Sequence, residues 1–276
     1  GGRFGSPITF RPGEVNPIVL TGTGSSDIFL AKYDKDGTLL WAESVVGSPG
    51  FFNEYVISIE IMSDGTTVVS GNFEGTTTFG AGEPNQTVLV SAGNTEAFVA
   101  KYNSNGTLAW AKRAGGSQYD SPRDMIVNQD GSIIVTGVMS ATATFGVGES
   151  NQTLLVSAGS WDIYIAKYSP NGSLVWAKRA GGLGANDSPY YIDKSTNGSF
   201  IVTGIIDETS TFGPGEANQT ILPTSSSLVL ANTFIAKYNA DGTLVWARQG
   251  SSSHPTNYSS NGARGMSIAN NGNITI

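Results

Sequence analysis

The sequence predicts an all-β protein built from four copies of one repeating sheet, and three observations lead to this prediction. A segment of twelve residues recurs four times along the 276-residue chain. Only 13% of the residues are charged, whereas Gly, Ser, Thr and Asn are abundant, which is typical of short strands joined by tight turns. Helical periodicity is nearly absent.

The recurring segment begins with Ala-Lys-Tyr and ends with Trp-Ala. It reads AKYDKDGTLLWA from Ala31, AKYNSNGTLAWA from Ala100, AKYSPNGSLVWA from Ala166 and AKYNADGTLVWA from Ala236. Its lysines are 69, 66 and 70 residues apart, at Lys32, Lys101, Lys167 and Lys237. A period of roughly 69 residues exceeds that of helical repeats and approaches a large propeller blade.

Each repeat is predicted to contain four strands. An apolar first strand, as in residues 124–128, is joined by an Asp-Gly or Asn-Gly turn to a β-branched second strand, as in residues 132–138. A third strand, as in residues 162–168, and a fourth, as in residues 173–180, form a second hairpin. Two hairpins make an antiparallel meander, and such sheets repeated about an axis form a β-propeller. We therefore expect a single propeller domain over residues 1–276 with four blades.

An excursion separates the two hairpins of each repeat. It reads TFGAGEPNQT from Thr78, TFGVGESNQT from Thr144 and TFGPGEANQT from Thr211, with TFRPGEVNP from Thr9 as a degraded copy. The apolar residues that follow, such as TLLV in residues 153–156, predict a further edge strand. We expect four such flaps at one rim, where they form the contact surface because blade packing does not require them. The alternative is a flap that folds onto its own blade.

The two ends of the chain are in phase with the repeat. Ile274, Thr275 and Ile276 align with residues 133–135, and the next pair, Thr136 and Gly137, is matched by Gly1 and Gly2. The chain therefore corresponds to four repeats divided inside one strand. Two arrangements explain this phase: a ring whose termini meet within one blade, and a segment of a longer repeat array.

These motifs resemble the bacterial β-propeller repeat known as the SBBP repeat. The order D-[IA]-[FY]-x-AKY-x-x-[DN]G-x-L-x-WA, DG-x-[IV]-[IV]-V-[ST]G and T-x-TFG covers essentially the whole chain. The resemblance implies a propeller fold in an exported bacterial or archaeal protein, often within a larger surface or secreted polypeptide, and it implies no single activity. The family name suggests seven blades, whereas four repeats are present here, so closure of the ring alone or with a neighbouring chain stays open.

Composition and charge exclude several classes of function. The formal net charge is −7 and the pI is near 4.7, so no basic stripe exists for nucleic acid. The absence of cysteine excludes disulfides, thiolate zinc sites and cysteine nucleophiles. No apolar run approaches the roughly 18 residues of a membrane-spanning helix, and no signal-peptide pattern opens the chain.

Nine Asn-x-Ser/Thr sequences have two interpretations. They are glycan acceptors if the organism glycosylates secreted chains, and otherwise they are turn residues beside Gly, Ser and Thr. The asparagines are Asn85, Asn105, Asn151, Asn171, Asn186, Asn197, Asn218, Asn257 and Asn273.

The repeated aromatic and cationic residues are predicted to be structural. Trp41, Trp110, Trp176 and Trp246 follow an invariant Leu by two residues, so Leu and Trp should share a strand face and pack between adjacent sheets. The alternative is a ring of sugar-stacking aromatics. The repeated lysines, which accompany Tyr33, Tyr102, Tyr168 and Tyr238, should extend past an apolar stem or pair with Asp27, Glu96 or Asp162.

Candidate sites for chemistry are few. The first strands of the blades should line an axial channel with Ser58 and Glu60, Asp124 and Ile126, Tyr191 and Asp193, and Gly265 and Ser267. Glu60, Asp124 and Asp193 would supply a cation or polar-ligand site there, or the paired carboxylates of a glycosidase. The turns Asp34–Gly37 and Asn239–Gly242 suggest calcium, but the equivalent turns lack carboxylates, and Asx-Gly is a common choice in tight hairpins. His254 is the one histidine and lies in a polar loop, so a two-histidine metal site is excluded and a Ser-His-Asp triad is disfavoured.

The function that the sequence favours is that of an extracellular or cell-surface scaffold, an adhesive or a filament-forming module without enzymatic activity. We expect no catalytic, cofactor-binding or metal-binding residues, and no cofactor. The expected partners are protein subunits, including copies of the chain, with no nucleic acid and no membrane insertion. A glycan-binding module is the second class and a secreted hydrolase the third.

Overall fold

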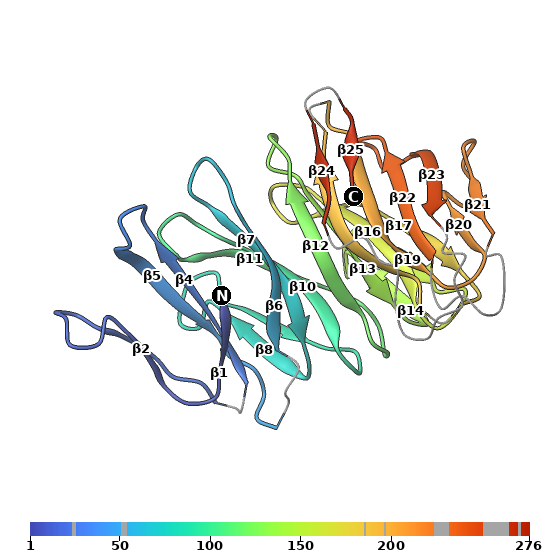
Figure 1. Ribbon diagram of the computed structural model, residues 1–276. Coiled ribbons are helices and arrows are strands. Elements are labelled where there is room, and N and C mark those ends of the chain that lie inside the picture. The colour runs from blue at the N-terminus through green and yellow to red at the C-terminus, as the bar shows by residue number, and fades with distance from the viewer. Residues whose placement is uncertain are drawn as a thin grey trace, which may run out of the picture. The chain divides into compact units, whose positions relative to one another are not determined.

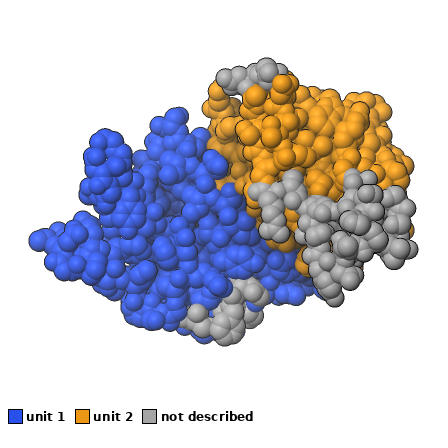
Figure 2. All heavy atoms as spheres, viewed as in Figure 1, with its two compact units in different colours: residues 1–121 blue, residues 122–276 orange. Residues whose placement is uncertain are grey.

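A computed structural model describes residues 1–23, 26–50, 54–184, 186–195, 197–223, 232–250, 265–269 and 272–276. Every regular element in these residues is a β-strand, so the predicted all-β class is confirmed. The chain divides into two compact units, Gly1–Ser121 and Pro122–Ile276 (Figures 1 and 2). A single propeller domain over residues 1–276 stays a prediction.

The first unit holds the sheets of the first two repeats. The first sheet has three strands in the order β1-β4-β5, and the second has four in the order β11-β10-β7-β6. Two hairpins, β2-β3 and β8-β9, are the flaps of these repeats. The strands are β1 (Gly2–Phe4), β2 (Ile8–Phe10), β3 (Ile18–Leu20), β4 (Asp27–Tyr33), β5 (Leu39–Val45), β6 (Tyr55–Ile61), β7 (Thr67–Phe73), β8 (Thr76–Phe79), β9 (Thr87–Val90), β10 (Glu96–Tyr102) and β11 (Leu108–Ala114).

The second unit holds the sheets of the next two repeats. The third-repeat sheet, in the order β12-β13-β16-β17, is extended by the fourth-repeat flap β20-β21, and the fourth-repeat sheet has the order β18-β19-β22-β23. The hairpins β14-β15 and β24-β25 form separate two-stranded sheets. The strands are β12 (Ser121–Val127), β13 (Ile133–Met139), β14 (Thr142–Phe145), β15 (Thr153–Val156), β16 (Asp162–Tyr168), β17 (Leu174–Gly182), β18 (Ser188–Lys194), β19 (Phe200–Ile206), β20 (Ser210–Phe212), β21 (Thr220–Leu222), β22 (Asn232–Tyr238), β23 (Leu244–Gly250), β24 (Ser267–Ile268) and β25 (Ile274–Thr275).

The predicted four-stranded meander is confirmed in the second, third and fourth repeats. In each, consecutive strands pair antiparallel and the first strand lies at one edge of the meander. The first-repeat sheet contains only the second, third and fourth strands, and its second strand β1 is shorter than β7. By sequence alignment, β24-β25 corresponds to the first two strands of a repeat. The predicted meeting of the termini within one blade stays a prediction.

The prediction that the repeated Leu and Trp share a strand face is wrong. In the first repeat, Lys32 pairs with Trp41 and Tyr33 pairs with Leu39, so one residue is bulged out of the fourth strand. Adjacent partners point to opposite faces of a sheet, and the bulge therefore sends Leu39 and Trp41 to opposite faces. The two side chains accordingly belong to different apolar clusters, Leu39 with Phe10 and Trp41 with Tyr102.

The predicted packing of tryptophan between adjacent sheets is confirmed where both sheets lie in one unit. Trp41 stacks on Tyr102 of the second sheet, with ring centroids 6.3 Å apart. Trp176 stacks on Phe200 of the fourth-repeat sheet at the same 6.3 Å separation. The two apolar cores thus lie between sheets, because a twisted sheet cannot bury its own apolar face.

Two flaps, β8-β9 and β20-β21, lie at the exposed edge of the preceding sheet in their own unit. Thr78 of β8 exchanges backbone hydrogen bonds with Val46, just after β5, at 2.8 and 3.0 Å. In the second unit, β20 pairs with β17 through Thr211 with Gly181 and Ser210 with Gly182. Each flap also packs on the fourth strand of its own repeat, as β9 does on β11. The flap therefore joins consecutive repeats and protects an edge that is otherwise open to pairing.

Candidate functional site

Three of the predicted channel-lining residues, Ile126, Asp124 and Asp193, are engaged in packing or in backbone hydrogen bonds. Ile126 is 6% exposed and belongs to the apolar core of the second unit, so it lines no polar channel. Asp124 accepts hydrogen bonds from the backbone N–H groups of Met125, at 2.9 Å, and of Ile192, at 3.1 Å. The Asp124 carboxylate thereby links β12 to β18. Asp193 accepts from the Lys194 N–H at 2.8 Å.

The remaining predicted positions are spread over the two units. Ser58 and Glu60 lie in β6 of the first unit, Tyr191 lies in β18 of the second unit, and Gly265 and Ser267 lie at β24. His254 lies outside the described residues. Within the described ranges, no group of three His, Cys, Asp or Glu side chains is placed to hold a metal ion.

In the Asx-Gly turns, the side-chain oxygen accepts hydrogen bonds from residues of the same turn. Asp34 Oδ1 accepts the N–H groups of Asp36 at 2.9 Å and Thr38 at 2.8 Å. Asp241 Oδ1 accepts the N–H and the hydroxyl of Thr243 at 2.9 and 2.7 Å. These bonds lower the pKa of both carboxyls, with Thr38 the largest cause for Asp34 and the Thr243 hydroxyl for Asp241. The geometry is that of a tight turn rather than of a calcium loop.

Two of the repeated lysines bind backbone carbonyls of the following repeat. Lys32 donates to the Gly65 carbonyl, and Lys167 donates to the Ala240 carbonyl at 3.2 Å. Glu96 and Asp162, which were predicted as possible lysine partners, pair with arginines of their own sheet. Arg113 contacts Glu96 at 2.8 Å, and Arg179 contacts Asp162. The lysines therefore join consecutive repeats without forming an ion pair at these two acids.

The most unusual chemical feature is a set of buried carboxylates where one repeat is followed by the next along the chain, which we call the junction carboxylates. One carboxylate begins the third strand of a repeat, and the other precedes the first strand of the next repeat. The pairs are Asp27 with Glu54, Glu96 with Asp120, and Asp162 with Asp187, and each side chain is at most 1% exposed. Sequence reasoning missed this set, although the acids before the first strand recur at the period of the repeat.

Glycine makes room for two of these pairs. A Cβ at Gly181 would lie 2.7 Å from Asp162 Cγ and 2.9 Å from Asp187 Oδ2. A Cβ at Gly115 would lie 2.8 Å from Asp120 Oδ2 and 2.9 Å from Glu96 Cγ. Because Cβ contacts below 3.0 Å are essentially never found in proteins, a side chain at either glycine would displace the carboxylates. Gly181, near the end of β17, and Gly115, directly after β11, are thus part of their junctions.

Two junction carboxyls have strongly raised pKa values. Burial raises the pKa of Glu54 to about 7, and the nearby charges of Glu74 and Asp27 act in the same direction. Burial likewise raises the pKa of Asp187 to about 7, with Asp207 and Asp162 adding to the shift. Clusters of this kind are characteristic of functional sites, but ion-pair networks in protein cores produce them too.

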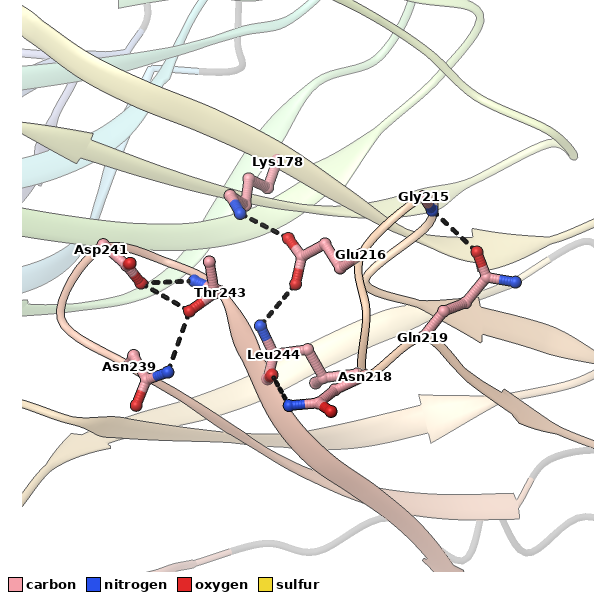
Figure 3. A network of polar contacts seen from close by, with 9 residues as sticks. All are labelled: Lys178, Gly215, Glu216, Asn218, Gln219, Asn239, Asp241, Thr243 and Leu244. Atoms are coloured by element: carbon pink, nitrogen blue, oxygen red, sulfur yellow. Dashed lines mark hydrogen bonds and ion pairs between the residues drawn. The ribbon is translucent and has the colours of Figure 1, made fainter.

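The flap motif G-x-G-E-x-N-Q is a clasp that fixes the flap to the fourth strand of its own repeat (Figure 3). Glu216 accepts the Leu244 N–H at 2.6 Å, and the Asn218 amide donates to the Leu244 carbonyl at 3.2 Å. Gln219 accepts the Gly215 N–H at 2.7 Å and closes the turn. Lys178 of the preceding repeat pairs with Glu216. The clasp recurs in the second and third repeats, at Glu83, Asn85 and Gln86 and at Glu149, Asn151 and Gln152.

The outer face of each flap is apolar and exposed to solvent. Along the second strand of a flap, one set of side chains packs inward, as Leu89 does, while the alternate set points outward. The outward side chains are between 50% and 60% exposed: Val19, Val88, Val90, Leu154, Val156 and Ile221. Repeated exposure of β-branched and Leu side chains marks an interaction surface better than scattered single residues do.

Comparisons with known proteins give distant relatives. No family model matches the chain. The chain is 28% identical over 185 residues to Regulatory protein FlaEY of Caulobacter vibrioides, covering 66% of this chain and 18% of that protein. It is 23% identical over 175 residues to an uncharacterised WD repeat-containing protein of Acanthamoeba polyphaga mimivirus, covering 60% of this chain and 12% of that protein.

The chain thus spans less than a fifth of the length of either relative. WD repeats build the four-stranded blades of propellers, so the second similarity agrees with a tandem-repeat β fold. In the described part of the chain, no helix meets the length and hydropathy needed to cross a bilayer.

Proposed function

We propose that the chain is a non-enzymatic β-propeller of the SBBP-like type that acts as a scaffold outside the cell or at its surface. In this proposal the four repeats are blades of the propeller. Its partners are protein subunits, including copies of the same chain, and assembly yields an adhesive or filament-forming module. Export and surface location rest on the family resemblance.

The exposed apolar face of the flaps is the observation that carries the proposal. It is present in all four repeats, although neither the clasp nor the core of a repeat requires outward-pointing Val, Leu or Ile. A repeating surface matches a partner that repeats with the same period, and another copy of this chain has that period. In this proposal the repeated residues inside the fold pack the sheets together, whereas the outward-pointing flap residues contact a partner protein.

The test is homotypic binding of the chain to immobilised copies of itself. Val88→Lys/Val90→Lys and Leu154→Lys/Val156→Lys place charges on one flap of each unit, and we expect each to weaken binding at least tenfold. Leu40→Lys and Val175→Lys are matched controls, because these side chains are 52% and 47% exposed but lie outside the flaps. Equal binding by the flap variants and the wild type would contradict the proposal.

The glycan-binding alternative has less support. Within the described ranges, Tyr33 and Tyr191 are the aromatic rings more than a third exposed, and each lies in a different unit. Trp41 is buried and Trp176 is packed against a core, which leaves both unsuited to stacking on a sugar.

In the described part of the chain, two cavities of the second unit have no pair of carboxylates in their walls, which gives the hydrolase alternative no support there. A cavity of about 390 Å³ in the second unit has Asp130 as its one acidic wall residue, beside Lys167 and Lys194. Another, of about 330 Å³, has Glu216. Asp130 accepts hydrogen bonds from Ser132, and Glu216 belongs to the clasp, so both carboxylates are engaged in structure.

A further inference from the structure

One position of the fourth strand carries opposite charges in the two units. It is the second residue after the repeated Trp. In β17 of the second unit this residue is Lys178, and in β5 of the first unit it is Glu43. The second and fourth repeats have Lys112 and Arg248 there. Three repeats therefore place a cation at this position, and Glu43 is the exception.

In the second unit, the ammonium of Lys178 compensates the carboxylate of the clasp. It pairs with one oxygen of Glu216, while the other oxygen accepts the Leu244 N–H at 2.6 Å (Figure 3). Lys178 and Glu216 line the cavity of about 330 Å³ together with Tyr238, the last residue of β22. This place between two sheets thus holds a positive charge beside a carboxylate and a tyrosine.

In the first unit, two carboxylates lie at the corresponding place. Glu83 accepts the Leu108 N–H at 2.6 Å, as Glu216 accepts that of Leu244, and Glu43 stands where the lysine would be. Burial raises the pKa of Glu43, and the nearby charge of Glu83 acts in the same direction. Two like charges in a partly buried place repel each other, and a cation between them removes that repulsion.

The Tyr102 hydroxyl is a third oxygen at this place. Tyr102 is 1% exposed, and within the described residues its hydroxyl has no hydrogen-bond partner. Burial raises the pKa of this hydroxyl, and the charges of Glu43 and Glu83 add to the shift, so both carboxylates lie near it. Because a buried hydroxyl without a partner costs free energy, Tyr102 indicates that a ligand belongs beside the two acids.

We propose that Glu43, Glu83 and the Tyr102 hydroxyl bind a hard divalent cation, with Ca²⁺ as the probe. Two carboxylates match the charge of a divalent ion, and Ca²⁺ accepts an irregular set of oxygen ligands that water completes. The Tyr102 oxygen contacts the ion or a water bound to it. The ion performs the task of the Lys178 ammonium in the second unit.

Two protein carboxylates make a weak site. Its affinity should resemble that of extracellular calcium modules, with a Kd of about 0.1 to 1 mM. Such a site is filled only where the ion is abundant. The inference does not depend on the flap surface, so either proposal stands if the other fails.

The experiment measures thermal unfolding of the chelator-treated full chain at pH 8, in CaCl₂ and in NaCl of equal ionic strength. At about 10 mM, Ca²⁺ should favour the folded chain at least tenfold over NaCl. Glu43→Gln should abolish this gain. Glu14→Gln is the matched control, because Glu14 is an exposed acid of the first unit outside the site, and it should respond as the wild type does.

Terbium luminescence reports the position of the ion. Tb³⁺ bound beside Tyr102 and the stacked Trp41 should emit when these rings are excited, and excess Ca²⁺ should quench the emission. Tyr102→Phe keeps the ring and removes the oxygen, so we expect Ca²⁺ to bind at least threefold more weakly. Unchanged circular dichroism shows that each variant folds.

The variant Glu43→Lys restores the cation that the second unit has at this position. We expect it to unfold at a higher temperature than the wild type without calcium and to show no response to calcium. Equal stabilisation of the wild type and Glu43→Gln by Ca²⁺ would place the ion elsewhere and overturn the inference. Equal effects of CaCl₂ and NaCl on the wild type would overturn it too, because they indicate charge screening alone.

Discussion

The Asp27–Glu54 junction of the first unit and the Asp162–Asp187 junction of the second unit each pack a Trp on an aromatic ring of the next sheet, but they compensate their carboxylates differently. In the second unit, Arg179 pairs with Asp162, and Asp187 accepts the Gly182 N–H at 2.8 Å and the Ser210 hydroxyl at 3.0 Å. In the first unit, Ser44 occupies the position of Arg179. There the Gly47 N–H is donated to Asp27 at 2.9 Å, and both oxygens of Glu54 are buried without a hydrogen-bond partner.

The same positions vary together in the other repeats. Glu96 faces Arg113 across the third and fourth strands, and in the fourth repeat the neutral Asn232 is matched by the neutral Gln249. Where the third strand begins with an acid, as at Glu96 and Asp162, the fourth strand carries an arginine opposite the residue two positions later. Asp27 is the exception, because the equivalent position on the fourth strand is Ser44. The comparison shows that indole packing is the constant part of a junction, whereas its charge compensation is adjustable.

Removing an indole should have the largest effect and should be equal in both junctions. We expect Trp41→Ala and Trp176→Ala each to lower the free energy of unfolding of their own unit by about 3 to 5 kcal/mol, because each leaves a cavity between two sheets. Urea unfolding followed by circular dichroism measures this loss. A large loss at one site and none at the other would break the comparison.

Removing Arg179 should lower the stability of the second unit, whereas the equivalent change at Ser44 should leave the stability of the first unit nearly unchanged. Arg179→Met leaves the Asp162 charge buried without its cation, and we expect a loss of about 3 kcal/mol at pH 7. The double variant Arg179→Met/Asp162→Asn should recover most of it, since no uncompensated charge remains. Ser44→Met is the matched control in the first unit and should change stability little. If Arg179→Met is as mild as Ser44→Met, the ion pair does not stabilise the junction.

The pH dependence of stability should reveal Glu54. Its folded-state pKa of about 7 lies above its ordinary value of 4.5, so the folded chain binds the proton more tightly than the unfolded chain. Stability is therefore fully present below pH 4.5, falls as the pH rises toward 7, and stays low above it. Glu54→Gln should remove this fall from the first unit and raise stability at pH 8 by about 2 kcal/mol.

The control for this effect is Asp187→Asn in the second unit. Asp187 shares the raised pKa but accepts three hydrogen bonds, from Gly182, Asp207 and Ser210, which an amide satisfies poorly. We expect its gain at pH 8 to be smaller than that of Glu54→Gln. A Glu54→Gln profile that parallels the wild type between pH 4.5 and 8 would show that Glu54 is not the titrating group.

The smallest expected effect comes from adding an arginine to the first unit, which should make its junction more like that of the second unit. Ser44→Arg introduces the arginine that the second and third repeats use toward the acid in the position of Asp27, and the Asp27 charge acts on Glu54. We expect a gain of about 1 kcal/mol at pH 8 and a weaker pH dependence, because a cation lowers the pKa of nearby carboxyls. Thermal unfolding at pH 5 and pH 8 measures both, and loss of stability at pH 8 would contradict the expectation.

The repeated strands and turns could be predicted from the sequence, but the side chains that share one face of a strand could not. Asx-Gly turns between β-branched runs predicted the meander, because only a few residue types suit a tight hairpin. The bulge opposite Lys32 and Tyr33 reversed the predicted face of Leu39, since a one-residue shift in a strand moves every later side chain to the other face.

The junction carboxylates were missed for a different reason. Asp27 and Glu54 are 27 residues apart and become neighbours only when two sheets stack, so no local pattern joins them. The recurrence of Glu54, Asp120 and Asp187 before the first strand was a visible signal, as was the matching of Glu96 with Arg113. The channel carboxylates were predicted from strand alternation alone. Strand alternation does not show that Asp124 accepts a hydrogen bond from the backbone of β18.

The central claim is that, within each unit, one sheet is completed by its successor, whose flap covers its edge. The chain has no cysteine, so Val46→Cys/Thr78→Cys introduces its only two thiols, at an antiparallel pair whose Cα atoms should be about 5.5 Å apart. Val46→Cys/Val88→Cys is the control, because Val88 pairs with Thr78 on the far strand of the flap. Mild oxidation should form an intramolecular disulfide in the first variant and none in the control. Two titratable thiols remaining in Val46→Cys/Thr78→Cys would contradict the account.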